Sequence, residues 1–257
     1  MARADPFIFG VPLIPRAGAQ DWEQVTKLLT ATLKSVLAQE DTDFRLILAA
    51  HDVPDCWEEL ALGDERFSVF RADWPPARPT MANDDAGAKK WHIRDLARAE
   101  GGGLLMYLDA DDLVDRRLVA TARQQIDQDT LAGVVARGFA IDFQTCLAAP
   151  LPGPGILNCS FDEVCGSSTV GRLSNSFPDP FDELGSHHLW RRNAEIKGLP
   201  LKALNVIGGY VVNTEENHSE RHGQFTKWRR SLNEAVNACG AFLSKRDKAI
   251  LGITDGC

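Results

Sequence analysis

The sequence predicts an α/β protein with a central, mostly parallel sheet and helices on both faces of that sheet. Short apolar runs alternate with segments of helical periodicity through the first half of the 257 residues. The runs are almost continuously apolar, as expected for strands that are buried on both faces of a parallel sheet. In such sheets, ligands bind beyond the carboxyl ends of the strands. We therefore expect three polar segments that follow strands, at 51–52, 73–85 and 109–112, to meet in one cleft.

The first 115 residues contain four predicted strands and two predicted helices. The run 7–14 is rich in β-branched and aromatic residues and is closed by Pro15, which predicts the first strand. Apolar residues then recur at helical spacing over 22–37, with Asp21 as a suitable N-cap. The remaining elements are strands at 44–50, 66–72 and 104–108, and a helix at 85–99 that the glycines 101–103 end.

The second half is less regular. The segment 149–155 is rich in Pro and Gly and is the best internal boundary. We interpret it as a loop within one domain covering 1–257, because either half alone would leave a face of the sheet uncovered. The predicted elements are helices at 115–127, 182–197 and 224–246, and strands at 132–142 and 203–214.

Composition excludes several classes of protein. A net charge of −8 argues against a general nucleic-acid or anionic-membrane binder, which would present a basic face. No stretch approaches the eighteen or so apolar residues of a transmembrane helix, and the apolar run near the N-terminus is too short for a signal peptide. The six cysteines show no CxxC pair, which indicates reduced thiols and a cytoplasmic protein. A bridge between Cys159 and Cys165 stays open.

Three carboxylates follow the fourth predicted strand directly. Alternate residues such as Asp109 and Asp111 can both reach a divalent ion, which in turn can bind the diphosphate of a ligand. The alternative is a solvated turn in which Asp111 or Asp112 caps the next helix. The position of the motif at the carboxyl end of a buried strand favours the ion-binding interpretation.

At this point the chain resembles the GT-A glycosyltransferases, in particular the family 2 group that uses nucleotide-sugars. The similarity rests on the opening strand, on "LKSVLAQ" (33–39), on "NDDAGAKKWHI" (83–93) and on "YLDADDLV" (107–114). It covers the first 115 residues well and the rest only in outline. The resemblance implies a GT-A fold in which 1–115 binds the nucleotide-sugar and 116–257 binds the acceptor.

The resemblance also implies roles for individual residues in the first half. Asp52 matches the acidic residue that meets the uracil or ribose, and Asp85 and Lys89 match a segment that touches base, ribose or phosphate. Asp111 matches the better metal ligand of the DxD motif, and Asp109 matches a ribose or metal contact. The segment "AAHDVPD" (49–55) departs from the usual pattern, so His51 or Asp55 is an alternative contact for the base.

A later segment, "NTEENHSERHG" (213–223), is rich in residue types that bind metals. GT-A enzymes often supply a third metal ligand, commonly His, from such a loop, and His218 is the residue that matches. His222 is the weaker substitute, and an exposed polar loop is the ordinary alternative. An imidazole ligand favours Mn²⁺ over Mg²⁺, so we expect Mn²⁺ or Mg²⁺ as cofactor, with a preference for Mn²⁺.

A catalytic base is required if the transfer inverts the anomeric centre, since a carboxylate must then deprotonate the acceptor hydroxyl. The resemblance places this base at the start of a helix on the acceptor side, where "DPFDELGSHHLWRR" (179–192) offers Asp179, Asp182 and Glu183, and we favour Asp182 or Glu183. Helix capping alone also explains acidic residues there. Neighbouring residues that are candidates for the acceptor pocket are His187, His188, Trp190 and Arg191.

These predictions combine into a metal-dependent, inverting glycosyltransferase that moves a sugar from a nucleotide-sugar, a UDP-sugar by the resemblance, to a hydroxyl acceptor. One alternative is a non-catalytic protein on the same fold that binds nucleotide-sugars or carbohydrates. Another is a phosphotransferase of the haloacid dehalogenase type, which also carries DxD after an apolar strand. That alternative is weaker because the motif here follows the fourth strand and has Leu113 where such enzymes have Thr or Val.

Overall fold

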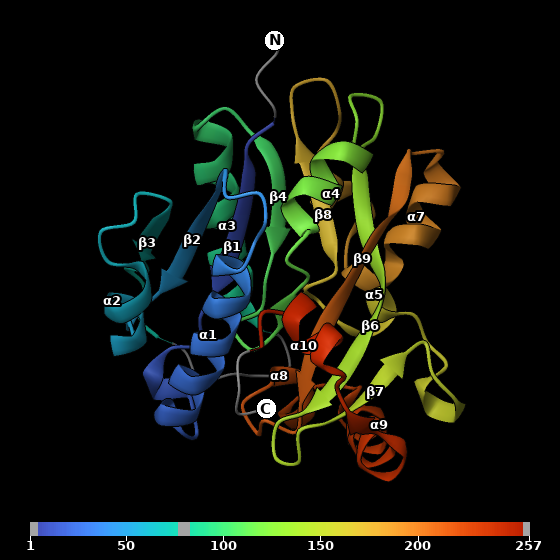
Figure 1. Cartoon of the computed structure of the whole chain (residues 1–257). Coiled ribbons are helices and arrows are strands. Elements are labelled where there is room, and N and C mark those ends of the chain that lie inside the picture. The colour runs from blue at the N-terminus through green and yellow to red at the C-terminus, as the bar shows by residue number, and fades with distance from the viewer. Residues whose placement is uncertain (1–4, 77–82, 254–257) are drawn as a thin grey trace.

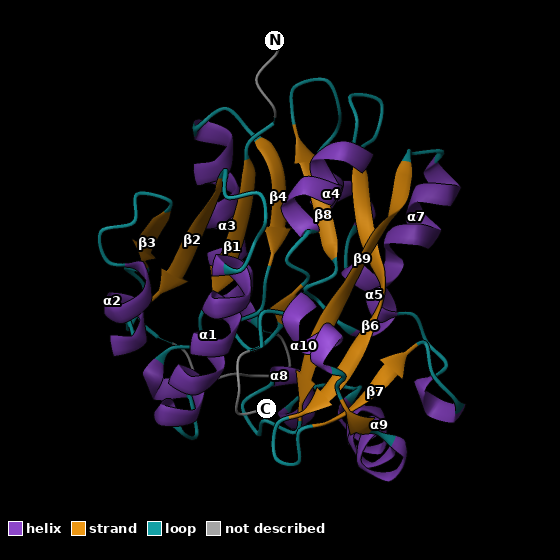
Figure 2. Cartoon of the chain, in the orientation of Figure 1, coloured by secondary structure: helices purple, strands orange, loops and turns teal. Residues whose placement is uncertain are grey.

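The computed structural model describes residues 5–76 and 83–253, and in this part of the chain ten strands form one sheet with helices on both faces (Figures 1 and 2). The α/β class and the helices on both faces are therefore confirmed. The segment 73–85 lies partly outside the described residues.

The first half of the chain forms the parallel part of the sheet. Its strands are β1 (Phe7–Pro12), β2 (Phe44–Ala50), β3 (Phe67–Arg71) and β4 (Gly103–Tyr107), in the spatial order β3-β2-β1-β4. Phe7 and Phe9 of β1 belong to the core on the side of α1 (Trp22–Leu37), whereas Ile8 packs with Ile93 of α3 (Asp84–Ala99). β1, β2 and β4 are buried on both faces, as the continuous apolar runs predicted, whereas the edge strand β3 is only partly buried.

The second half extends the sheet with strands of both directions. It contributes β5 (Leu113–Val114), β6 (Ala132–Asp142), β7 (Leu147–Leu151), β8 (Thr169–Leu173), β9 (Leu201–Val212) and β10 (Ala241–Phe242). β8 is antiparallel to both β4 and β6, while β9 runs parallel to β6 and antiparallel to β5. The sheet is thus parallel in its first half and mixed beyond it. Part of the predicted loop 149–155 belongs to β7, which pairs with β6.

The helices of the second half are shorter than their periodicity predicted. They are α4 (Leu118–Gln125), α5 (Phe161–Val164), α6 (Pro180–Leu184), α7 (Trp190–Lys197), α8 (His218–Arg221), α9 (Thr226–Cys239) and α10 (Lys245–Ile250). A single helix over 182–197 does not form, because Gly185 adopts a φ of 73° between α6 and α7. The short α2 (Asp55–Ala61) and the 3-10 turn η3 (His187–Leu189) were not predicted.

The cysteines are only partly as expected. Cys159 and Cys165 are free thiols, so no bridge joins them, and Cys56 and Cys239 are free as well. Cys146 takes part in a disulfide, contrary to the expectation of reduced thiols alone. Among the described residues, no helix combines the length and the apolar composition that crossing a membrane requires.

Candidate active site

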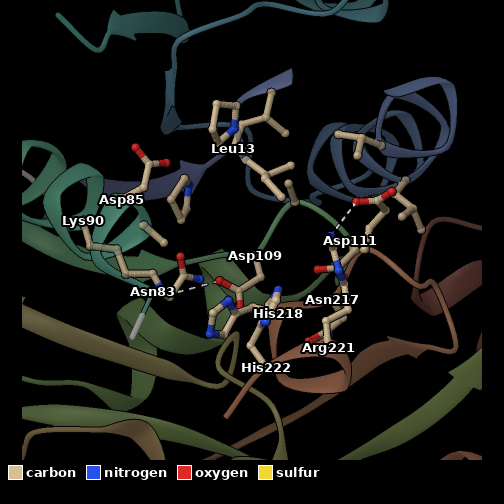
Figure 3. Close-up of a pocket in the computed structure, with 18 of the residues that line it drawn as sticks. Leu13, Asn83, Asp85, Lys90, Asp109, Asp111, Asn217, His218, Arg221 and His222 are labelled. Carbon is tan, nitrogen blue, oxygen red and sulfur yellow. Dashed lines mark hydrogen bonds and ion pairs between the residues drawn. The ribbon is translucent and has the colours of Figure 1, made fainter. Parts of the chain in front are cut away.

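A cavity of about 210 Å³ lies where β1 and β4 end, between the start of α3 and the loop that carries α8 (Figure 3). The residues from β1 and α1 that line it are apolar, and the others are mainly polar or charged. The polar and charged lining residues are Asn83, Asp84, Asp85, Lys90, Asp109, Asp111, Glu216, Asn217, His218, Arg221 and His222. Two of the three segments expected in one cleft, 109–112 and the described end of 73–85, thus contribute to this cavity.

His51 and Asp52 line a neighbouring hollow together with Arg16 and Arg71, not the cavity itself. Asp85 connects the two, because it lines the cavity while its Oδ1 lies 3.8 Å from Nδ1 of His51. The predicted cleft is therefore divided into two adjacent parts. Asp55 also lies in the wall of the second hollow.

The three carboxylates after β4 have different environments. Asp109 and Asp111 line the cavity and are partly exposed. Asp112 is buried and accepts hydrogen bonds from Ser167 Oγ at 2.7 Å, Cys165 Sγ at 3.2 Å and Val211 N at 3.2 Å. It does not cap the next helix, which starts at Leu118. Asp112 instead ties the turn before β8 and strand β9 to the acidic loop.

In the acidic loop 109–112, burial and mutual repulsion disfavour the ionised forms of two carboxylates. Burial, and then the charges of Asp112 and Asp109, raise the pKa of Asp111 well above its usual range. Burial, and then the charge of Asp109, raise the pKa of Asp112 to about 7. Both carboxylates would ionise more readily with a cation beside them.

The facing loop is held in place by two buried carboxylates. Glu216 accepts hydrogen bonds from Gln20 N at 2.8 Å and Asp21 N at 2.6 Å, at the start of α1. Glu220 accepts from Asn213 N at 2.7 Å and from Thr214 N at 3.2 Å. Both anchors lie on the segment that presents two histidines and an arginine to the cavity.

His218 and His222 lie one helical turn apart, with their ring centroids separated by 5.3 Å. Both line the cavity that contains Asp109 and Asp111, and Nε2 of His222 is buried without a hydrogen-bond partner in the described part of the chain. No three His, Cys, Asp or Glu side chains within residues 5–76 and 83–253 are already grouped closely enough to bind an ion. The carboxylates and the imidazoles that line the cavity nevertheless fit a divalent cation in their chemistry.

A buried polar cluster supports the start of α3. Asp85 accepts hydrogen bonds from Trp74 Nε1 at 3.1 Å and Lys89 Nζ at 2.6 Å. Lys89 also donates to the carbonyl of Leu13 at 2.6 Å and has no exposed side-chain surface, so burial lowers its pKa despite the nearby Asp85. The structure therefore places Lys89 beneath the cavity, and the next residue, Lys90, lies in the cavity wall.

The predicted catalytic bases do not reach the cavity. Asp182 forms an ion pair with Arg94 at 2.7 Å, and Glu183 forms one with Lys197 at 2.6 Å. Neither residue is part of the cavity wall. The structure thus leaves Asp182 and Glu183 in ion pairs at α6, outside the cavity. Trp190, a candidate for the acceptor pocket, is 1% exposed and belongs to the core.

Six polar or charged cavity residues had no individual role in the sequence interpretation, namely Asn83, Asp84, Lys90, Glu216, Asn217 and Arg221. Asn83 and Lys90 flank the predicted nucleotide-binding residues Asp85 and Lys89. A rotation of about 100° per residue separates Lys90 from Lys89, and only the packing of α3 shows which of them faces the ligand. Glu216 carried no local signal, because its partners are 195 and 196 residues away in the sequence.

His187 is expected to make the stability of the fold depend on pH. Its Nδ1–H donates to the carbonyl of Asp162 at 2.7 Å, and burial lowers its pKa from 6.5 to about 4. The unfolded chain therefore binds a proton between these values that the folded chain does not, so stability falls as the pH drops from 6.5 to 4. Between pH 6.5 and 4 we expect the free energy of unfolding of wild type to fall by up to about 3 kcal/mol more than that of His187→Gln, as measured by urea unfolding. Parallel pH profiles for the two proteins would contradict this assignment.

No protein-family model matches the chain, and no curated protein matches it either. Among solved structures, TarS from S. aureus in complex with UDP-GlcNAc is 13% identical with a TM-score of 0.48, over 95% of this chain and 70% of that chain. The galactosyltransferase LgtC, in complex with donor and acceptor sugar analogues, is 12% identical with a TM-score of 0.42, over 96% of this chain and 100% of that chain. A putative nucleotide-diphospho-sugar transferase from Desulfovibrio desulfuricans is 11% identical with a TM-score of 0.41, over 91% of this chain and 96% of that chain. Similarity at this level carries no argument about activity, so function has to be inferred from the site.

Proposed function

We propose that this protein is a metal-dependent glycosyltransferase that transfers a sugar from a nucleotide-sugar, a UDP-sugar in our proposal, to a hydroxyl acceptor. The observation that supports it most is the adjacency of Asp109 and Asp111 in the cavity wall at the carboxyl end of β4, where burial and the neighbouring charges of Asp112 and Asp109 raise the pKa of Asp111. Negative charge that is concentrated and partly withdrawn from water needs a cation, and a divalent ion would in turn attract a diphosphate. Excess acidity of this kind would be costly in a cavity without a charged ligand.

In this proposal Asp109, Asp111 and His218 hold the ion, with His222 as the substitute for His218. When bound, a divalent cation stabilises the negative charge that develops on a departing nucleoside diphosphate. His51, Asp52 and Asp85 contact the base and ribose from the adjoining hollow, and Asp85 is kept in position by Lys89 and Trp74. Glu216 keeps the loop 213–222 against α1, which maintains the cavity between the two halves of the chain.

A thermal-shift experiment with UDP tests the proposal directly. UDP at about a hundred times its Kd is expected to raise the Tm by about 5–10 °C when Mn²⁺ is present, and by much less without it. The reason is that Asp109 and Asp111 repel a diphosphate until a cation separates the charges. Adenine, guanine and cytosine nucleotides serve as controls for the base. Equal shifts with and without Mn²⁺ would contradict metal dependence.

A second candidate is a nucleotide-sugar-binding protein without transferase activity. One observation favours it: Asp182 and Glu183, the predicted bases, are engaged by Arg94 and Lys197 outside the cavity. Slow hydrolysis of the donor distinguishes the two functions, since a transferase usually releases UDP to water when no acceptor is present. A protein that binds UDP with Mn²⁺ but releases no UDP from any UDP-sugar, with or without sugar acceptors, would be the binding protein.

A further inference from the structure

Two adjacent lysines on α3 have separate environments. Lys89 is fully buried and is held by Asp85 and the Leu13 carbonyl. Lys90 points into the cavity, where its side chain retains 32% of its exposure. The buried Lys89 side chain cannot move to contact a ligand, whereas the partly exposed Lys90 side chain can.

Lys90 is held at its backbone and is loosely bound at its charged end. Its carbonyl accepts a hydrogen bond from the Tyr107 hydroxyl at 2.8 Å, and its Nζ lies 5.7 Å from the centre of the Tyr107 ring. The same Nζ is 3.3 Å from Oδ1 of Asp109, longer than the roughly 2.7–2.9 Å of a strong charge-assisted hydrogen bond. Figure 3 shows Lys90 reaching from α3 towards Asp109. An ammonium group in this arrangement can leave the carboxylate at low cost.

We propose that Lys90 is the internal counter-ion of Asp109 in the metal-free protein and moves to the donor's diphosphate when a divalent cation binds. This inference rests on the proposed function. A cation at Asp109 and Asp111 repels the Lys90 ammonium, while a diphosphate bound to that cation supplies new negative charge within reach of the same side chain. Lys90 thus opposes metal binding and supports nucleotide binding.

Arg221 provides a comparison on the opposite wall of the cavity. Its Nη1 lies 3.4 Å from Oε2 of Glu216, so it is also loosely paired, but its partner is not one of the proposed metal ligands. Loss of Arg221 would remove a positive charge that can reach a phosphate. It would not release a metal ligand from an ion pair.

The test is a change of opposite sign in two affinities of Lys90→Met. We expect Mn²⁺ alone to bind about three- to tenfold more tightly than to wild type, because an ion pair and a competing charge are removed. We expect UDP at saturating Mn²⁺ to bind about tenfold more weakly, because a charge-assisted bond to phosphate is lost. Manganese binding is measured by electron paramagnetic resonance and UDP binding by calorimetry, so neither readout requires turnover.

Matched variants separate this role from a general effect of charge. Arg221→Met is expected to weaken UDP binding without the gain in Mn²⁺ affinity. Lys27→Met removes an exposed charge on α1 that pairs with Glu23, outside the cavity, and is expected to change neither affinity. Unchanged or weaker Mn²⁺ binding by Lys90→Met would overturn the counter-ion role, and unchanged UDP binding would overturn the phosphate role. Failure of the wild type itself to bind Mn²⁺ or UDP would instead overturn the proposed function together with this inference.

Discussion

Replacing Asp111 by asparagine is expected to abolish metal-dependent UDP binding and sugar transfer while it stabilises the fold. The substitution removes the charge that the proposed cation requires, so kcat should fall by at least about a hundredfold. The same charge is unfavourable in the metal-free protein, because Asp111 is desolvated beside Asp112 and Asp109. An amide of the same shape lacks this repulsion. Function and stability should therefore change in opposite directions.

The gain in stability should depend on pH in a specific direction. Below the unfolded-state pKa of about 3.9 the Asp111 carboxyl is protonated in both states and costs nothing. Above that value the unfolded chain releases its proton while the folded chain retains it, because the folded pKa is raised. Wild type is therefore expected to lose stability relative to Asp111→Asn as the pH rises from 3.5 to 7.5.

Urea unfolding of both proteins at three pH values in this range, without divalent ions, measures the difference. Adding Mn²⁺ at pH 7.5 should stabilise the wild type and leave Asp111→Asn almost unchanged. Two results would each rule out the proposed role of Asp111: metal-dependent UDP binding that survives the substitution, or a variant less stable than wild type at neutral pH.

Replacing the adjacent Asp112 by alanine is expected to have the opposite effect on stability. The substitution leaves Ser167 Oγ, Cys165 Sγ and the Val211 amide without their buried acceptor. Unpaired buried donors cost more than the relief of repulsion returns, so we expect a loss of about 2–4 kcal/mol in the free energy of unfolding. The main consequence of Asp112→Ala is therefore a weaker connection between β4, β8 and β9.

Turnover should respond differently from stability in this variant. Ser167 Oγ donates to Asp112 and accepts from the Asp109 amide at 2.8 Å, so Asp112 orients the metal-binding loop only indirectly. We expect Asp112→Ala to retain measurable transfer and Mn²⁺-dependent UDP binding at a temperature where it is folded. Circular dichroism melts and donor turnover of the same samples separate the two effects. Wild-type stability, or complete loss of Mn²⁺ binding in folded protein, would show that Asp112 has a different role.

The sequence alone was sufficient for the four strands and the two long helices of the first half, though not for the short α2, and for the location of the acidic loop. The predicted strand 44–50 agrees with β2, and the predicted helix 22–37 agrees with α1, including hydrogen bonds from its first turn to Asp21. These elements bury side chains in a regular order along the chain, so local periodicity records their boundaries. The position of Asp109 and Asp111 follows from the same logic, because residues after a parallel strand must lie at the sheet edge.

The tertiary structure alone decided which charged residues are available to a ligand. Asp182 and Glu183 are carboxylates that could act as catalytic bases, yet they form ion pairs with Arg94 and Lys197 outside the cavity. Glu216 resembles any exposed acid in the sequence, yet it joins the loop 213–222 to the start of α1. Such pairings depend on contacts between segments that are distant in the sequence. Neither segment shows a local sequence pattern that would predict the contact. Residue type and spacing determined where charge is concentrated in this protein, and packing determined which of those charges face the cavity.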